Sequence, residues 1–261
     1  GRLVADRLAD LAPVLLVRDP SRAPSIAGSE VRTASYDDQA VHALHGVDTL
    51  FMVSASESAE RRQQHRAFLD SATRAGVQHI VYTSFSAADP AADFTLGRDH
   101  ADAEQAVRES GMAFTLLRDN FYLDVLPLFA DEAGVIRGPA GEGRVAAVAR
   151  ADVADVAAVV LRDPGAHAGA SYELSGPEAL TLAEVAARAG AVLGRSLSFH
   201  DETVEEAYAS RAPSGAEQWQ LDAWVSTYTA IANGEVAHVS DAVERLTGHP
   251  ARTLEQALSG S

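Results

Sequence analysis

The 261-residue sequence contains no cysteine and no lysine. Without cysteine the chain has no disulfide, no thiol nucleophile and no thiolate-bound metal, which favours a cytoplasmic location. Without lysine it has no Walker A phosphate loop, no Schiff-base nucleophile and no Tyr-x-x-x-Lys catalytic pair. No apolar run reaches the length that spans a membrane, and no signal peptide is visible, so we expect no membrane partner.

Basic residues are outnumbered as well. The 21 basic residues, all arginine, face 37 acidic ones, and the formal net charge is −16. A nucleic-acid surface requires a basic patch, so a nucleic-acid partner is not expected. The same charge repels an anionic cofactor at long range, and any phosphate site must therefore be locally basic. With 47% hydrophobic residues, the length suits one large α/β domain or one domain with a small appendage.

A short buried strand is predicted over Val14–Val17, and it stops at Arg18, Asp19 and Pro20. An apolar strand with a charged tip, one helix in from the N-terminus, is typical of the second strand of a dinucleotide-binding unit, where the adenosine ribose is recognised. The planar fork of an arginine at this tip binds the 2′-phosphate of NADP through paired hydrogen bonds. The alternative is that Arg18 is a solvated strand end before a turn proline.

The N-terminal segment has the pattern of an amphipathic helix from its first residues, with Leu3, Val4, Arg7 and Leu8 at helical spacing. A dinucleotide unit needs a strand and a glycine-rich turn before that helix. We therefore expect Gly1 to be the last glycine of such a turn, with about a dozen further residues before it. The alternative is a natural start at a flexible glycine.

Strands and helices alternate four times at regular spacing beyond this point, which predicts a parallel sheet with right-handed crossovers. The predicted fold is a Rossmann-type doubly wound α/β sheet, with an NAD(P)-binding domain over residues 1–133. The predicted strands are 14–17, 30–35, 48–53, 78–83 and 113–117. The predicted helices are 1–8, a segment through Leu44 capped by Asp37 or Asp38, 60–76 and 98–110.

The remaining residues, 134–261, are expected to form a smaller mixed α/β lobe that provides the substrate cleft. Part of 145–174 is expected to return to the main sheet. Residues 134–143 have the pattern of a glycine-rich hairpin or loop, and a helix over 216–233 carries Trp219 and Trp224, which we assign to substrate binding. The other predicted elements are helices 151–162 and 181–193 and strands 171–174 and 197–199.

Six short motifs together resemble the NmrA-like atypical short-chain dehydrogenase/reductases, and especially their quinone- and triphenylmethane-reducing members. The motifs are V-R-D-P at 17–20, S-A-S-E at 54–57, Q-H-R at 64–66, Y-T-S at 82–84, L-L-R-D-N-F-Y at 116–122 and L-T-G-H-P at 246–250. The resemblance implies a Rossmann fold, the cofactor NADP(H) and a small conjugated electron acceptor. The family's opening T-G-A-T-G-x-x-G is absent from this sequence apart from Gly1.

The resemblance also implies a role for individual residues. The implied cofactor contacts are Gly1 at the turn, Arg18 on the 2′-phosphate, Tyr36 and Asp37 beside adenine, Val53, Ser54 and Ser56 along the ribose and pyrophosphate, and Ser84, Phe85 and Asn120 toward the nicotinamide. Phe121 and Tyr122 are assigned to the substrate. The alternatives are ordinary strand-end capping for the three serines and core packing for Phe121 and Tyr122.

The catalytic candidates are His100 and Glu104. His100 falls where related reductases place their catalytic lysine, and Glu104 lies one turn later on the same helix face. A histidine of near-neutral pKa can donate a proton while a carboxylate orients its ring. The alternative is a surface histidine paired with a structural glutamate, because a quinone needs little acid assistance. The nine histidines show no ligand pattern, so we expect no metal.

Two functions from different classes fit these observations. The first is an NADPH-dependent reductase of a small-molecule acceptor such as a quinone or a dye, and a homodimer is compatible with it. The second is a regulator that senses NADP(H) without turnover and docks on a partner protein. An aromatic cleft built from Phe85, Phe121, Trp219 and Trp224 would favour the enzyme. A nucleotide-sugar or isoflavone-type reductase is disfavoured by the missing lysine.

Overall fold

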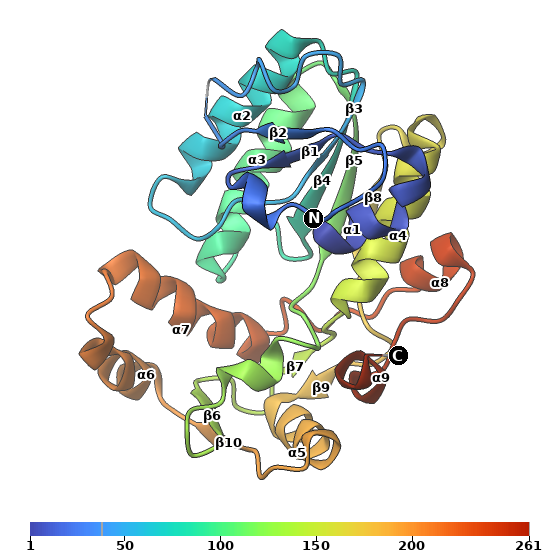
Figure 1. The fold of residues 1–261 in the computed structure, drawn as a ribbon. Helices are drawn as coiled ribbons and strands as arrows, with labels where there is room; N and C mark the ends of the chain where they lie inside the picture. The colour runs from blue at the N-terminus through green and yellow to red at the C-terminus, as the bar shows by residue number, and fades with distance from the viewer. Residues whose placement is uncertain (38, 261) are drawn as a thin grey trace. The chain divides into compact units, whose positions relative to one another are not determined.

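The computed structural model describes residues 1–37 and 39–260, which form two compact units (Figure 1). The first unit comprises Gly1–Ser84, Asp99–Leu117 and Ala154–Tyr172. The second comprises Phe85–Arg98, Arg118–Val153 and Glu173–Ser261. Both units are therefore discontinuous in sequence. The assignment of residues 1–133 to the cofactor and 134–261 to the substrate stays a prediction.

Six strands that lie mostly in the first unit form two sheets. They are β1 (Leu15–Val17), β2 (Val31–Thr33), β3 (Thr49–Met52), β4 (His79–Phe85), β5 (Ala113–Asp119) and β8 (Ser171–Leu174). β1 pairs in parallel with β2, and β3 pairs in parallel with β4 in a four-stranded sheet of order β3-β4-β5-β8. β4 is buried along its whole length, as expected for a strand covered on both faces.

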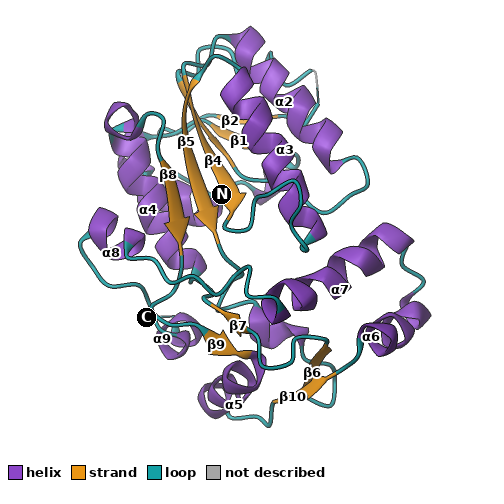
Figure 2. Ribbon diagram, turned by 180° about the vertical axis from the view of Figure 1, so that it is seen from behind, coloured by secondary structure: helices purple, strands orange, loops and turns teal. Residues whose placement is uncertain are grey.

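Helices cover both faces of this sheet. They are α1 (Arg2–Arg7), α2 (Arg61–Ala75), α3 (Thr95–Glu109) and α4 (Arg150–Arg162). Figures 1 and 2 show α2 and α3 on one face and α1 and α4 on the other. α2 ends where Gly76 adopts a left-handed φ of 86° and its N–H bonds the carbonyls of Ala72 and Thr73. The predicted doubly wound Rossmann-type arrangement is confirmed.

One predicted helix is wrong. Residues 39–46 form consecutive turns instead of a helix through Leu44. The carboxylate of Asp37 accepts a hydrogen bond from the amide of Gln39 at 3.1 Å, and such a side-chain bond two residues on favours a turn over a helix. The segment closes at Gly46, whose φ is 75°. The alternative cap, Asp38, lies outside the described residues.

The second unit combines short strands with helices around its own apolar core. Its strands and helices are β6 (Val135–Gly138), β7 (Arg144–Val145), β9 (Leu180–Thr181), β10 (Ser198–Asp201), α5 (Leu182–Leu193), α6 (Val204–Arg211), α7 (Gln218–Ala232), α8 (Ala242–Thr247) and α9 (Leu254–Ser259). β7 pairs antiparallel with β9. Thr181 caps α5 through a reciprocal bond with Glu184, as its sequence position predicts.

The glycine-rich segment 134–143 contains a strand. β6 pairs in parallel with β10, so its partner comes from much later in the chain and the segment does not form a hairpin of its own. Gly138 lies against the ring of Tyr228, where an added Cβ would approach the ring atoms to 2.3 Å. This glycine is therefore required by packing, a reason that a turn-based interpretation of the sequence does not contain.

Candidate functional site

Arg18 follows the last residue of β1, and its side chain is exposed. Within the described ranges it forms no hydrogen bond or ion pair, although its charge partly opposes the burial that raises the pKa of Tyr36. The adjacent Asp19 is engaged instead with Ser21, accepting from its amide at 3.0 Å and its hydroxyl at 2.7 Å. A guanidinium at a strand tip, without a partner in the part of the chain described, is placed to bind an anion.

Tyr36 and Val53 are brought together from two different strand ends. The hydroxyl of Tyr36, after β2, donates to the carbonyl of Val53, the first residue after β3. The ring packs on Phe68, with the centroids 4.4 Å apart. Burial raises the pKa of the Tyr36 hydroxyl, which is therefore neutral and a donor. Gly1 lies at the start of α1, where its carbonyl accepts from the amides of Val4 and Ala5.

The loop after β3 is held through its backbone. The amide of Ser54 donates to Oγ1 of Thr83 at 2.9 Å, and the amide of Ala55 donates to Nε2 of His65 at 2.9 Å. The guanidinium of Arg61 donates to the carbonyl of Ala55 at 2.9 Å. The exposed Ser56 follows directly. Two α2 side chains thus fix the strand-end loop that the sequence assigns to ribose and pyrophosphate.

His65 is fully buried beneath this loop. Burial, together with the charge of Arg61, lowers the pKa of His65 to about 3, so the ring is neutral. Because Nε2 accepts from Ala55, the proton lies on Nδ1, which has no hydrogen-bond partner among residues 1–37 and 39–260. The ring packs edge-on to Tyr36 and Tyr82, at centroid distances of 6.2 and 5.9 Å. His65 therefore supports the loop from within the core.

His100 lies on α3 and is buried. Its Nε2 is 3.0 Å from the guanidinium of Arg61, and its Nδ1 is 3.0 Å from the hydroxyl of Tyr82. A guanidinium can only donate, so Nε2 is the acceptor and the ring proton points at Tyr82. Burial and the nearby positive charge hold the pKa of His100 well below its ordinary value. The ring is therefore neutral, with both nitrogens engaged inside the first unit.

Glu104 is buried one turn further along α3. Its carboxylate accepts from the hydroxyl of Ser84 at 2.6 Å and from Arg108 at 3.2 Å. Ser84, the penultimate residue of β4, is thus connected to α3 through Glu104. The sequence analysis proposed His100 and Glu104 as a pair. In the structure His100 contacts Arg61 and Tyr82, and Glu104 contacts Ser84 and Arg108.

The predicted residues of the second unit fall into two groups. Phe85 and Phe121 form a cluster with Phe94, with ring centroids 5.0 to 5.3 Å apart, and they belong to the apolar core. Trp219 and Trp224 are half-buried on α7 and make no ring contact within the described residues. The structure therefore groups two of the four aromatic residues proposed for a cleft.

The chain after β5 carries several polar contacts. Asn120 donates through Nδ2 to the carbonyl of Val236 at 2.9 Å and accepts through Oδ1 from the amide of Phe121 at 2.8 Å. Tyr122 donates to the buried carboxylate of Asp119 at 2.5 Å. Burial raises the pKa of Asp119 to about 7, against the opposing effect of the Tyr122 bond. Asp119 was not among the residues selected from the sequence, although its position at a strand end before Asn120 was a signal.

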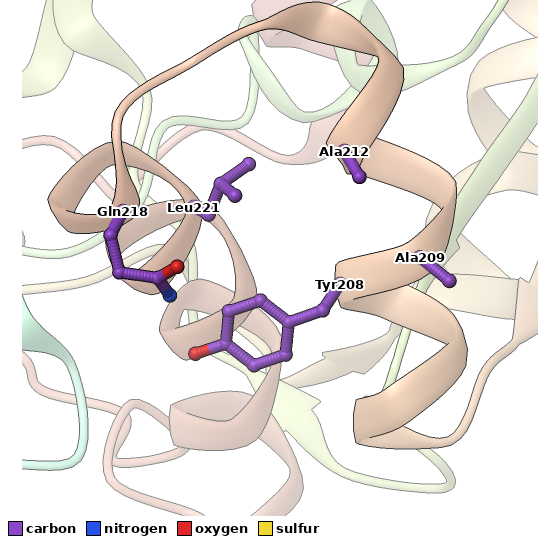
Figure 3. A pocket seen from close by; sticks show the side chains of 5 residues that line it. All are labelled: Tyr208, Ala209, Ala212, Gln218 and Leu221. Atoms are coloured by element: carbon purple, nitrogen blue, oxygen red, sulfur yellow. The ribbon is translucent and has the colours of Figure 1, made fainter.

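Two pockets open in the second unit. One, of about 330 Å³, lies at the ends of β4, β5 and β8 and is lined by Ser86, Asn120, Glu173, Leu174, Ser175, Glu235, Val236 and His238. The other, of about 460 Å³, lies between α6 and α7, and Figure 3 shows its five lining side chains. In that pocket the Tyr208 hydroxyl and the Gln218 amide both donate to Asp222 at 2.8 Å, so each of these donors already has a partner.

None of the helices in the described ranges is long and apolar enough to cross a bilayer.

Comparisons with known proteins place these observations in context. Residues 1–164 match the NAD(P)H-binding family model. The chain is 33% identical to quinone oxidoreductase 2 of Escherichia coli over 99% of this chain and 94% of the relative. It is 34% identical to an NAD(P)H azoreductase of Xenophilus azovorans over 92% of this chain and 86% of the relative.

Two solved structures are informative. The E. coli NADPH-dependent quinone oxidoreductase, solved with NADPH, superposes with a TM-score of 0.87 at 33% identity and covers 100% of this chain and 95% of that chain. The negative transcriptional regulator NmrA superposes with a TM-score of 0.72 at 17% identity, over 99% of this chain and 92% of that chain. At that identity the second likeness concerns the fold alone.

Proposed function

This chain belongs to the NAD(P)H-binding family, and from that membership we propose that it reduces a small conjugated acceptor, such as a quinone or an azo dye, with NADPH. It is an NAD(P)H-dependent reductase, because the relatives that it matches over nearly its full length are an oxidoreductase of quinones and an NAD(P)H azoreductase. The choice of NADPH over NADH and of the acceptor class is our inference. The observation that carries it is the full-length similarity to a quinone oxidoreductase together with the exposed Arg18 at the tip of β1.

The residues of the first unit fit the adenosine half of NADPH. Arg18 offers a guanidinium without a partner in the described chain, which suits the 2′-phosphate. The ring of Tyr36 offers a flat surface for adenine beside Asp37, and the loop 53–56 offers small residues on a backbone held by Arg61. Gly1 suits the turn at the pyrophosphate, and Ser84 the nicotinamide side. This set supports binding of the cofactor by the first unit and binding of the acceptor by the second.

NADPH, when bound, supplies the hydride for this reaction. The chain's own residues have little proton chemistry to add, because a quinone that receives a hydride becomes a stabilised oxyanion that takes its proton from water. His100 carries its ring proton toward Tyr82 inside the first unit, which favours a positioning role for it. Orientation of the two reactants is then the main contribution of the protein.

The experiment is a steady-state assay of NADPH oxidation by the purified protein against a panel of acceptors, namely 1,4-naphthoquinone, 1,4-benzoquinone and the azo dye methyl red, with NADH in a parallel series. We expect turnover with at least one acceptor and higher kcat/KM with NADPH than with NADH. Oxidation no faster than without protein across the panel, with NADPH bound, would instead support the sensing regulator.

A further inference from the structure

The pocket of about 330 Å³ lies at the carboxyl ends of three neighbouring strands. Ser86 follows β4, Asn120 follows β5, and Leu174 and Ser175 stand at the end of β8. These three strands are neighbours in the sheet order β4-β5-β8. Backbone hydrogen bonds hold these three strand ends in register. The Ser86 amide donates to the Asp119 carbonyl at 2.8 Å, and the Asn120 amide donates to the Leu174 carbonyl at 3.2 Å. Ligands of open α/β sheets bind outside the carboxyl ends of the strands.

Ser86 gives this pocket an unused hydrogen-bonding group. Its hydroxyl oxygen is buried and has no hydrogen-bond partner among the described residues, whereas its amide is already bonded to Asp119. A buried hydroxyl without a partner is uncommon, because it gives up its bonds to water without replacement. A carbonyl oxygen of a bound molecule would satisfy it. Ser86 was not among the residues selected from the sequence.

The other polar groups of the lining are largely committed to the fold. Glu235 accepts from the amides of Asp93 and Phe94 at 2.7 and 3.4 Å. Glu173 is paired with Arg118 at 3.1 Å. Asn120 bridges Val236 and its own neighbour, so its position is fixed. These groups shape the pocket and hold it open without an arginine side chain in its wall.

The charge of the lining selects against anions. Two carboxylates, Glu173 and Glu235, line the pocket, and the only basic type in the lining is His238, which is exposed at the rim. The net charge of −16 acts in the same direction. Glu173 is already paired with Arg118, so a sulfonate or phosphate group on the ligand would face mainly the carboxylate of Glu235, with no arginine in the lining to bind it. A neutral ligand meets no such penalty.

We propose that this pocket binds the acceptor, that Ser86 donates a hydrogen bond to the acceptor's carbonyl oxygen, and that the preferred acceptors are neutral quinones of one or two rings. The inference rests on the proposed reductase function and specifies its substrate class. The volume is at the small end of the range for ligand pockets, roughly 300–1,000 Å³, and so favours a compact ring system over an extended dye.

The test compares two serine variants and two acceptors. Ser86→Ala removes the hydroxyl from the pocket. Ser29→Ala is the matched control, because its hydroxyl is likewise buried without a partner in the described chain but lies in the loop before β2, in the first unit. The acceptors are 1,4-naphthoquinone and its 2-sulfonate, which share one ring system and differ in charge. For Ser86→Ala we expect KM for 1,4-naphthoquinone to rise about tenfold, the loss of one hydrogen bond, with KM for NADPH unchanged.

The expected results for the other arms follow. Ser29→Ala should leave both KM values unchanged, and the wild-type protein should prefer the neutral quinone over its sulfonate by at least about tenfold in kcat/KM. Equal KM values for Ser86→Ala and Ser29→Ala, or no preference between the acceptors, would overturn the proposal.

Failure of the reductase function is distinguished by a binding measurement. Equilibrium dialysis of 1,4-naphthoquinone reports the pocket without turnover. Weaker binding to Ser86→Ala than to the wild-type protein supports the pocket even if NADPH is not consumed. Equal binding to both proteins, or none to either, overturns the assignment of the pocket whatever the activity.

Discussion

The guanidinium of Arg61 donates to Nε2 of His100 across 3.0 Å, and this contact decides which ring nitrogen carries the proton. The proton lies on Nδ1, 3.0 Å from the hydroxyl of Tyr82 in the interior of the first unit. The same guanidinium donates to the carbonyl of Ala55 in the loop after β3. His100 is thereby connected to the loop assigned to the cofactor, as a positioning residue.

The first prediction concerns His100. We expect His100→Ala to lower kcat for 1,4-naphthoquinone less than about tenfold, whereas loss of a general acid costs roughly 10²- to 10⁴-fold. His79→Ala is the control, because His79 is also buried, bonds Thr115 at 3.0 Å and stands at the opposite end of β4 from Ser84. A fall in kcat beyond about 10²-fold in folded His100→Ala, without the same fall in His79→Ala, would show that His100 is the proton donor.

The second prediction concerns cofactor choice. Arg18→Ala should weaken NADPH binding by about 1.5–3 kcal/mol through the loss of a charge-assisted bond, while NADH binding stays nearly constant. Arg22→Ala removes the same charge at an exposed position four residues later, at the end of the 3-10 helix Pro20–Arg22, and should have a smaller effect. Isothermal titration with both cofactors measures this. Equal losses for NADPH and NADH in Arg18→Ala would remove Arg18 from the phosphate site.

The third prediction concerns the pH dependence of stability and rests on two buried groups, His65 and Asp119, whose pKa values shift in opposite directions on folding. The pKa of His65 is lowered in the folded state from 6.5 to about 3. As the pH falls, the histidine is therefore protonated in the unfolded chain at a higher pH than in the folded chain. Its contribution to stability is complete above pH 6.5 and is lost as the pH falls toward 3. The pKa of Asp119 is raised from 3.8 to about 7, so its contribution is complete below pH 3.8 and is lost as the pH rises toward 7.

These contributions separate by mutation. Between pH 4 and 6.5, each group should change the free energy of unfolding by roughly 1 kcal/mol per pH unit, with opposite signs. His65→Gln, which keeps an acceptor for the amide of Ala55, should lose less stability on acidification than the wild-type protein. Asp119→Asn should lose less stability than the wild-type protein as the pH rises. Urea unfolding across this range checks both, and parallel pH curves for the wild-type protein and both variants would contradict the assigned protonation states.

Local signals predicted much of this structure. The strand at Val14–Val17, the end of α2 at Gly76 and the cap of α5 at Thr181 depend on neighbouring residues alone, and the position of each is confirmed to within a residue. The predicted burial of that strand is wrong beyond Leu15, because Leu16 and Val17 are only half-buried. The family resemblance, the Rossmann-type fold and the NAD(P)H-dependent reductase activity are also confirmed by the family match and the relatives. The individual cofactor and substrate contacts stay predictions.

Contacts between segments that are distant in the sequence could not be predicted from its periodicity. Arg61 reaches both Ala55 and His100, and only the folded α2 and α3 bring these groups together. The pairing of β6 with β10 joins segments separated by the whole of α5. The unpartnered hydroxyl of Ser86 depends on what the folded chain leaves unbonded, which no residue pattern encodes.

The central claim is NADPH-dependent reduction of a quinone, and a single-turnover measurement tests it most directly. The protein is loaded with less than one equivalent of NADPH without free cofactor, mixed rapidly with excess 1,4-naphthoquinone in the absence of oxygen, and followed for nicotinamide oxidation and hydroquinone formation. We expect one hydroquinone for each NADPH oxidised, at a rate well above that of the same mixture without protein. Bound NADPH that stays reduced while the quinone remains unchanged would contradict the account.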